Sequence, residues 1–449
     1  VTETLEPYFV SGYEGVVDFL QSLEEQPIKI LATAPALVSI SRTARDMPPE
    51  TLAKLLKRDD ILGLGESYWQ GVLQEPEQVL PRFEQALAAG KTLEGHSAGA
   101  RDKKLAAYVA GGISSCHEPI NADQVLERLR LGLHIMVREG SIRRDLAEIA
   151  KIKDTGIDLR RLILSTDGVE PQDLIEKGYM EFVLRKAIEH GFDPVAAIQM
   201  ATLNVAEHFS LDGLIGGIAP GRYADLVIIP DVQTIQAQMV ISSGNVVAEK
   251  RTLLAAPRNH TFSKPSMNSI KLPRDMKSSD FIISTDPKAS HVKVRIIDMV
   301  TDLVTAELEM QRPVINGRIN TDVDQDVIKV AAIDRTHNPG NIYVGLIKGF
   351  GLKSGAMACS SAWDTSDIIV AGASDADMAS AVNRIRALQG GAVVYENGEI
   401  LAELPLPIFG IMSDLPIETI ADRLQKIKST VSDLGVTFPD PLLTLITLT

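Results

Sequence analysis

Short apolar, β-branched runs alternate with segments of helical periodicity along the first half of the chain. The runs cover residues 28–34, 61–66, 92–96, 112–117, 133–138 and 162–167. This alternation predicts parallel strands joined by helical crossovers. The runs follow one another at intervals of roughly 20 to 35 residues, which suits a (β/α) barrel. The rival architecture, an open doubly wound sheet, usually has a Gly-rich phosphate turn after its first strand, and the sequence has none.

Two of the helical segments begin with recognisable capping residues. Asn121 precedes a segment in which Val125 and Leu129 share one face. Asp193 precedes Pro194, which suits the first position of a helix. Side-chain oxygens at these positions accept hydrogen bonds from the unpaired N–H groups of a first helical turn. We therefore expect helices to begin just after Asn121 and Asp193.

The pattern changes after residue 212. Strands at 239–241 and 246–249 flank a four-residue loop, 242–245, which predicts a hairpin. Residues 254–273 contain three Pro and show little periodicity, as a linker does. A further region begins at about residue 276. It contains a predicted helix, 375–388, and a predicted hairpin around Asn397-Gly398. We predict a barrel domain at 1–212, a short antiparallel segment at 213–253, a linker at 254–275 and a C-terminal domain at 276–449.

Composition narrows the class of protein. The net charge of −14 over 449 residues argues against nucleic acid or an anionic membrane as a partner. No apolar run approaches the ~20 residues of a membrane-spanning helix. Cys116 and Cys359 are too few for a disulfide framework, so a reducing cytoplasm is expected. The chain begins with Val1 and no signal-peptide pattern, which favours a processed chain or a fragment.

Four polar residues fall at the carboxyl ends of different predicted strands: Glu66, His96, His117 and Asp167. In a barrel these ends converge on the face that carries the chemistry. Imidazole and carboxylate are ligands for Zn, Mn or Fe, and two neighbouring metals can share one hydroxide. A single strand-end His is more often structural, but four such residues on separate strands favour a metal site.

The remaining candidates have simpler interpretations. His134 is expected in the core, and His208 at the end of a helix. His337 lies in a turn-rich loop, 335–340, where a structural role and a contact with substrate both stay open. Cys116 neighbours His117 on one strand, so the two side chains should point to opposite faces, and we expect Cys116 to be packed. The sequence contains no Gly-x-Ser-x-Gly elbow, P-loop or Cys-x-x-Cys.

Several of these segments resemble a known family. Residues 63–66, 94–99, 112–118 and 165–167 look like the successive metal motifs of adenine deaminases, members of the amidohydrolase superfamily. Segments 201–206 and 217–227 resemble superfamily fingerprints, and 340–352 and 404–407 are similar to the extra C-terminal domain of these deaminases. The resemblance implies an α/β fold: strands 3–8 of a TIM-like amidohydrolase barrel, part of a small β-sandwich domain, and an α+β C-terminal domain.

The resemblance also implies roles for the site residues. Glu66 would bridge two divalent metals, with Mn or Fe favoured over Zn, while His96 and His117 would ligate one metal and Asp167 the other. A metal-bridged hydroxide would convert adenine to hypoxanthine and ammonia, with Asp167 moving the proton to the leaving amine. Glu118 would protonate a ring nitrogen if burial keeps its carboxyl neutral, or would form a salt bridge.

The sequence departs from the family pattern in several places. It contains no His-x-His pair, which the family has on its first barrel strand, and six strands cannot close an eight-stranded barrel. We therefore expect a fragment, or completion by a second polypeptide, and association into a homo-oligomer through exposed strand edges. Cys116, Gly168, Tyr179 and Trp363 stand where the family has other polar residues. Three alternatives stay open: deamination of another purine or of a 6-substituted purine, hydrolysis of a cyclic amide, and a non-catalytic paralogue.

Overall fold

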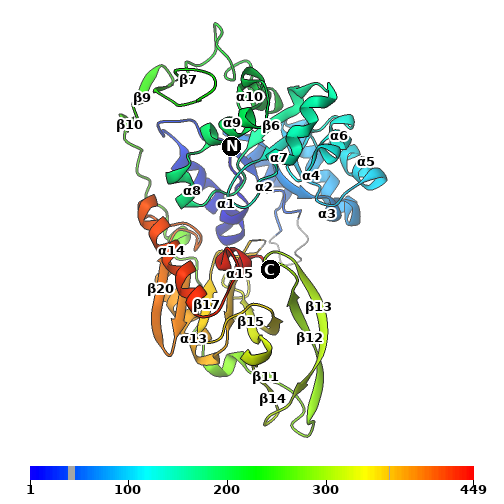
Figure 1. Ribbon diagram of the computed structural model, residues 1–449, viewed down its shortest axis with the longest axis vertical. Helices are drawn as coiled ribbons and strands as arrows, with labels where there is room; N and C mark the ends of the chain where they lie inside the picture. Colours follow the sequence, from blue (N-terminus) through cyan, green and yellow to red (C-terminus); the bar gives the residue numbers. More distant parts are fainter. Residues whose placement is uncertain (39–45, 364, 449) are drawn as a thin grey trace. The chain divides into compact units, whose positions relative to one another are not determined.

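The computed structural model describes residues 1–38, 46–363 and 365–448 (Figure 1). Its contacts divide the chain into two compact units. Unit 1 comprises residues 1–5 and the described part of 19–261; unit 2 comprises residues 6–18 and the described part of 262–449. Helix α1 (Leu5–Leu23) supplies residues to both units and bends at Gly12, whose φ is 64°. No helix in the described ranges has the length and apolar character needed to cross a membrane.

Within the described residues, unit 1 is built on six parallel strands. They form two sheets, ordered β1-β2-β3 and β4-β5-β6. The strands are β1 (Ala32–Ala34), β2 (Ile61–Tyr68), β3 (Thr92–His96), β4 (Ser115–Cys116), β5 (His134–Arg138) and β6 (Leu162–Ser165). A hydrogen bond of 2.9 Å from Ser114 N–H to the Leu93 carbonyl joins the residue before β4 to the start of β3. The predicted parallel strands are confirmed, although β1 starts later than the predicted run at 28–34.

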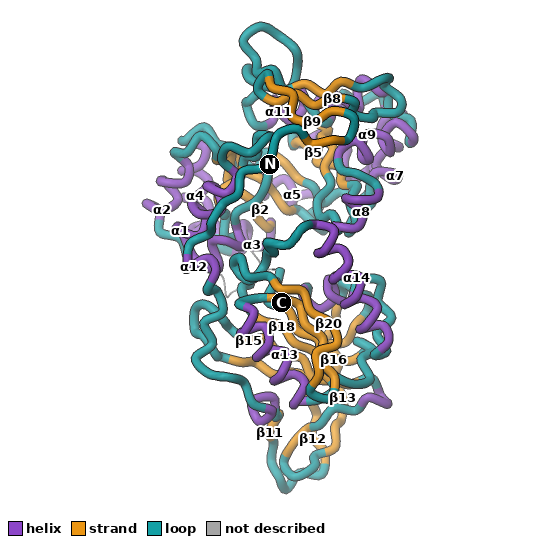
Figure 2. The backbone as a smooth tube through the Cα atoms, turned by 90° about the vertical axis from the view of Figure 1, so that its left-hand side faces the viewer, coloured by secondary structure: helices purple, strands orange, loops and turns teal. Residues whose placement is uncertain are grey.

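Helices separate these strands, as the sequence predicts, and four more helices, α8 to α11, follow β6. Together they are α2 (Pro49–Leu56), α3 (Trp69–Gln74), α4 (Pro76–Ala88), α5 (Asp102–Ala110), α6 (Ala122–Arg130), α7 (Leu146–Ile149), α8 (Pro171–Glu176), α9 (Met180–Glu189), α10 (Pro194–Met200) and α11 (Leu203–His208). In α4 the buried residues Val79, Phe83 and Ala86 recur at helical spacing, so one face packs inward. Figure 2 shows the helices around the strands of this unit.

Both predicted helix caps are confirmed. The Asn121 side chain accepts a hydrogen bond of 3.0 Å from Gln124 N–H at the start of α6. The Asp193 carboxylate accepts hydrogen bonds of 3.0 Å from the N–H groups of Val195 and Ala196. Each cap satisfies donors that the first turn of a helix leaves unpaired.

The predicted hairpin near residue 244 has a shorter turn than expected. Unit 1 ends in an antiparallel sheet ordered β10-β9-β8-β7, made of β7 (Leu226–Ile228), β8 (Met239–Ser242), β9 (Asn245–Glu249) and β10 (Thr252–Leu253). Ser242 pairs with Asn245, so the loop has two residues and the predicted four-residue loop is wrong. Ser243 and Gly244 both have positive φ, 49° and 81°, as tight hairpin turns require.

Among the described residues of unit 2, eight strands form one sheet ordered β13-β12-β16-β15-β18-β17-β19-β20. These are β12 (His291–Met299), β13 (Thr305–Pro313), β15 (Val327–Ile333), β16 (Ile342–Lys348), β17 (Ala356–Cys359), β18 (Ile368–Gly372), β19 (Gly391–Glu396) and β20 (Glu399–Pro405). A small pair, β11 (Ile283–Ser284) and β14 (Arg318–Ile319), lies beside it. The helices are α12 (Lys264–Met267), α13 (Asp375–Leu388), α14 (Ile417–Asp433) and α15 (Pro441–Ile446).

The central strands of the large sheet of unit 2, β15, β17, β18 and β19, are buried on both faces. On β15, Ile328 and Val330 pack in one core with residues of α14, while Ala331 and Ile333 pack in a second core with residues of α13. This alternation follows from the two-residue period of a strand. The predicted helix 375–388 matches α13, and the predicted Asn397-Gly398 turn joins β19 to β20; both predictions are confirmed.

Candidate metal centre

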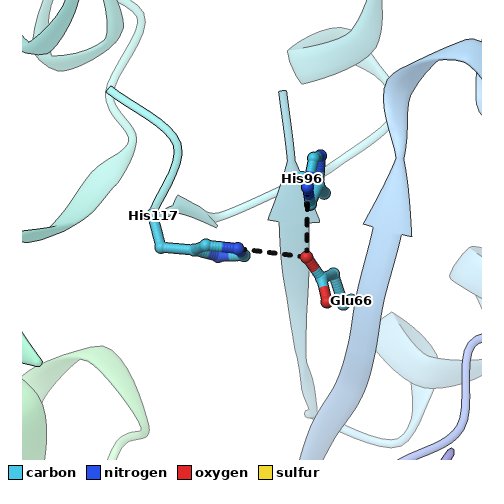
Figure 3. A group of neighbouring side chains, drawn as sticks. All are labelled: Glu66, His96 and His117. Carbon is cyan, nitrogen blue, oxygen red and sulfur yellow. Dashed lines mark ion pairs between the residues drawn. The ribbon is translucent and has the colours of Figure 1, made fainter. Parts of the chain in front are cut away.

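Unit 1 brings together three of the four residues predicted from strand ends. Glu66 lies on β2, His96 is the last residue of β3, and His117 directly follows β4. β2 and β3 are parallel neighbours, and Leu93 near the start of β3 accepts a hydrogen bond from Ser114, just before β4, so the three strands carry their last residues toward one place. Figure 3 shows the three side chains pointing toward one another.

The three side chains present two imidazole nitrogens and a carboxylate oxygen to one point. Glu66 Oε1 lies 3.0 Å from His117 Nε2 and 3.6 Å from His96 Nε2. One donor atom from each residue falls within 4.8 Å of the others, which makes this the one group in the described part of the chain that could hold a metal ion. The side chains keep 17 to 31% of their surface exposed, so solvent or a small substrate can reach them.

Buried neighbours fix the position of His96. The Tyr108 hydroxyl accepts a hydrogen bond of 2.9 Å from His96 N–H and donates one to the Ser67 carbonyl. Tyr108 therefore bridges the ends of β2 and β3 through its side chain. The ring of Tyr68 stacks on the His96 ring at 4.0 Å between centroids. Cys116 is buried as expected, with its Sγ 2.8 Å from Ser97 Oγ, and it is not part of the three-donor group.

A second, carboxylate-rich layer adjoins the three donors. Glu118 Oε1 lies 3.2 Å from His117 Nε2 and 3.5 Å from His96 Nε2. Arg138, at the end of β5, donates to Glu118 at 2.6 Å and to Asp167 at 3.1 Å. Asp167 is thus paired with Arg138 and is not a member of the three-donor group. Of the two roles that the sequence left open for Glu118, the structure has the salt bridge.

The ionisation of these groups follows from their pairing. Burial alone would lower the pKa of His117, but the carboxylates of Glu66 and Glu118 raise it well above its usual value. Burial would raise the pKa of Glu118, yet the hydrogen bond from His117 and the charges of His117, His96 and Arg138 hold it well below the usual range. Burial lowers the pKa of His96, so its imidazole is neutral near pH 7.

The donor set fits a divalent metal. Two imidazoles and one carboxylate suit Zn, Mn or Fe, and neutral imidazole is the form that ligates. The proton on His117 and a metal ion would compete for the same nitrogen, so binding would release a proton. The three donors together could therefore hold one divalent metal ion.

Sequence reasoning missed a largely buried carboxylate next to the site, whose side chain is 13% exposed. Glu94 lies two residues before His96 on β3, and its carboxylate pairs with His208 Nε2 at 3.0 Å and accepts a hydrogen bond from Ser115. His134 stacks obliquely on His208, with 4.6 Å between ring centroids. The two-residue spacing of Glu94 and His96, which puts both on one face of a strand, was the available signal.

The other His singled out from the sequence, His337, lies in unit 2. It lines a cavity of about 540 Å³ together with Asp334, Tyr343 and Asp367. The Asp334 carboxylate accepts hydrogen bonds from three backbone N–H groups, including that of His337, and so organises the loop. A structural role for this loop is therefore visible; the contact with substrate stays a prediction.

Comparison with known proteins adds to this geometry. Residues 78–247 match the amidohydrolase family, and residues 302–449 match the adenine deaminase C-terminal domain. An adenine deaminase of Moorella thermoacetica is 36% identical over 97% of this chain and 74% of its own length. One of Cenarchaeum symbiosum is 36% identical over 96% of this chain and 71% of its own length. A solved N-acetyl-D-glucosamine-6-phosphate deacetylase of Mycobacterium smegmatis is 18% identical, with a TM-score of 0.42, over 55% of this chain and 74% of that one.

Proposed function

This chain belongs to the adenine deaminase family, which makes it a hydrolase of C–N bonds, and we propose that it converts adenine and water to hypoxanthine and ammonia. The observation that carries this proposal is the 36% identity to adenine deaminases along nearly the whole chain. The group of Glu66, His96 and His117 supports it, because a hydrolase of this kind needs such donors.

We assign the metal to these three donors. When bound, a divalent metal supplies a water of lowered pKa, which is a nucleophile near neutral pH. More specifically, we propose two metal ions per site, with Mn or Fe favoured over Zn. Asp167 would be a ligand of the second ion. Mixed imidazole and carboxylate donors support Mn and Fe as well as Zn.

The chain's own carboxylates would move the protons. Attack of water on C6 of adenine requires a base for one water proton and an acid for the leaving amino group. We assign both tasks to Asp167, which takes the proton and then donates it to the amine as ammonia leaves. Glu118 is ionised in this arrangement, so it would first take up a proton before giving it to a ring nitrogen of the purine.

The test is ammonia release from adenine by the full gene product, expressed with Mn(II), with the absorbance change from adenine to hypoxanthine followed in parallel. Asp167→Asn should lower kcat by orders of magnitude with no loss of fold. The control is Asp158→Asn, since Asp158 pairs with Arg160 on the surface, and it should turn over normally. Turnover by Asp167→Asn within threefold of wild type would refute the assignment of Asp167.

The alternatives give different results in the same experiment. A folded, metal-loaded protein without adenine turnover would instead be assayed on 6-substituted purines and cyclic amides. A folded protein that binds no stoichiometric metal would indicate a non-catalytic paralogue. The expected homo-oligomer, a cytoplasmic location and the absence of nucleic acid or membrane partners are further proposals, which sedimentation, fractionation and binding measurements would test.

A further inference from the structure

Arg138 is a buried cation that no predicted step uses. It is the last residue of β5, and only 4% of its side chain is exposed. In the register of the sheet, β5 lies between β4 and β6. Glu118 follows β4 and Asp167 follows β6, so Arg138 lies between the two carboxylates assigned above to proton transfer.

The guanidinium of Arg138 contacts three carboxylates at once. Its Nη1 donates to both Glu118 Oε1, at 2.6 Å, and Asp167 Oδ2, at 3.1 Å. Its Nη2 donates to Asp145 Oδ2 at 3.2 Å. Asp145 lies just before α7 and does not belong to the donor group. Asp145 therefore fixes one nitrogen of the planar guanidinium, Nη2. The other nitrogen, Nη1, binds the carboxylates of both Glu118 and Asp167.

The backbone around Arg138 is built for close approach to the Asp167 loop. Glu139 N–H donates to the Ser165 carbonyl and Ser141 N–H to the Gly168 carbonyl, each at 2.9 Å. A Cβ on Gly140 would lie 2.1 Å from the Thr166 carbonyl oxygen, so only glycine fits there. Asp167 itself has a φ of 57°, an uncommon conformation for a residue other than glycine. The two loops are thus fastened together, and the side chain of Asp167 is directed to Arg138.

From these contacts we propose that Arg138 is a positioning residue, which holds Glu118 and Asp167 in the geometry that proton transfer to and from the purine requires. The proposal rests on the proposed function for the identity of the reaction. Two carboxylates this close repel each other in a partly buried site, and the shared guanidinium offsets that repulsion. Without it the two side chains would separate, and a displacement of about 1 Å can lower a rate on the order of 10²-fold.

The experiment compares Arg138→Ala and Arg138→Lys with wild type. Arg138→Ala should lower kcat by about 10² to 10³-fold while KM changes less than about threefold. Guanidinium ion added to Arg138→Ala should restore part of the lost kcat, since it can occupy the vacated position. Arg138→Lys should be intermediate, because an ammonium keeps the charge but loses the fork. Arg160→Ala, which removes an exposed arginine paired with Asp158, is the matched control and should not change kcat.

A positioning role and a merely structural role separate in these data. Loss of kcat with retained metal content and partial guanidinium rescue supports the proposal. A kcat of Arg138→Ala within threefold of wild type, or a loss that only follows loss of metal and is not rescued, overturns it. If Arg138→Ala does not fold, Asp145→Asn decides: a lowered kcat with normal metal content supports positioning through Arg138, and an unchanged kcat overturns it.

Failure of the proposed function would be visible separately. Wild type is assayed first, and no ammonia from adenine would refute the reaction while leaving Arg138 testable. The protein would then be loaded with Co(II), whose visible absorption bands respond to the groups around the ion. Altered bands in Arg138→Ala, with Co(II) content unchanged, would support positioning of the carboxylates; identical bands would overturn it.

Discussion

Tyr108→Phe tests how the metal-binding end of β3 is held. The Tyr108 hydroxyl stands between two strands: it accepts from His96 N–H and donates to the Ser67 carbonyl. Tyr108 and Ser67 are fully buried, with 0% of their surface exposed, so water cannot easily replace the hydroxyl. Phe keeps the ring and its packing and removes only the oxygen.

The magnitude follows from the two backbone groups that lose the hydroxyl as a partner. Each buried donor or acceptor that loses its partner costs about 1–3 kcal/mol. Because the strand ends can shift to bond each other directly and recover part of this, we expect Tyr108→Phe to lower the free energy of unfolding of unit 1 by about 2–4 kcal/mol. Such a shift would also move His96, so kcat should fall by about tenfold or more.

Urea unfolding followed by tryptophan fluorescence provides the assay. The chain has two Trp, Trp69 in unit 1 and Trp363 in unit 2. A Trp363→Phe background leaves Trp69 as the reporter, and its indole N–H donates to the Ala98 carbonyl at 2.7 Å. Tyr223→Phe, at a residue of unit 1 that is 50% exposed, is the control and should change stability by less than about 0.5 kcal/mol. A change that small in Tyr108→Phe itself would refute the bridging role.

Three further predictions follow from other contacts. Burial and the charge of His208 lower the pKa of His134 to about 4. The unfolded state therefore binds a proton at this residue more readily than the folded state, and the free energy of unfolding should fall as the pH is lowered from 6.5 to 4. In acid unfolding curves, His134→Gln should remove about 2 kcal/mol of that fall. Chelation should lower the Tm of wild type but not of His117→Ala, with metal content measured by mass spectrometry; an equal drop in both would contradict the site. Asp375→Ala removes the carboxylate that pairs with the Lys329 ammonium, whose side chain is only 3% exposed. The free energy of unfolding, measured with urea, should fall by about 3 kcal/mol. An unchanged free energy of unfolding would show that the pair does not contribute to stability.

The sequence by itself determined the local elements and the positions of the donors. Helix α13, the caps at Asn121 and Asp193, and strand β3 follow from spacing and capping chemistry, which depend on residues a few positions apart. Because residues at the carboxyl ends of neighbouring parallel strands must meet, His96 and His117 could be expected at one site without coordinates.

The tertiary structure decided which partner each charged group has. The sequence pattern indicated no role for Arg138, Tyr108 or Glu94 at the site. Tyr108 contacts His96, Arg138 contacts Asp167 and Glu94 contacts His208, which are 12, 29 and 114 residues away, and contacts of that range depend on strand register and the depth of each side chain. The same long-range pairing made Glu118 a salt-bridged carboxylate, because burial acts together with the charges that surround a group, and only the folded chain brings Arg138 and His117 to it.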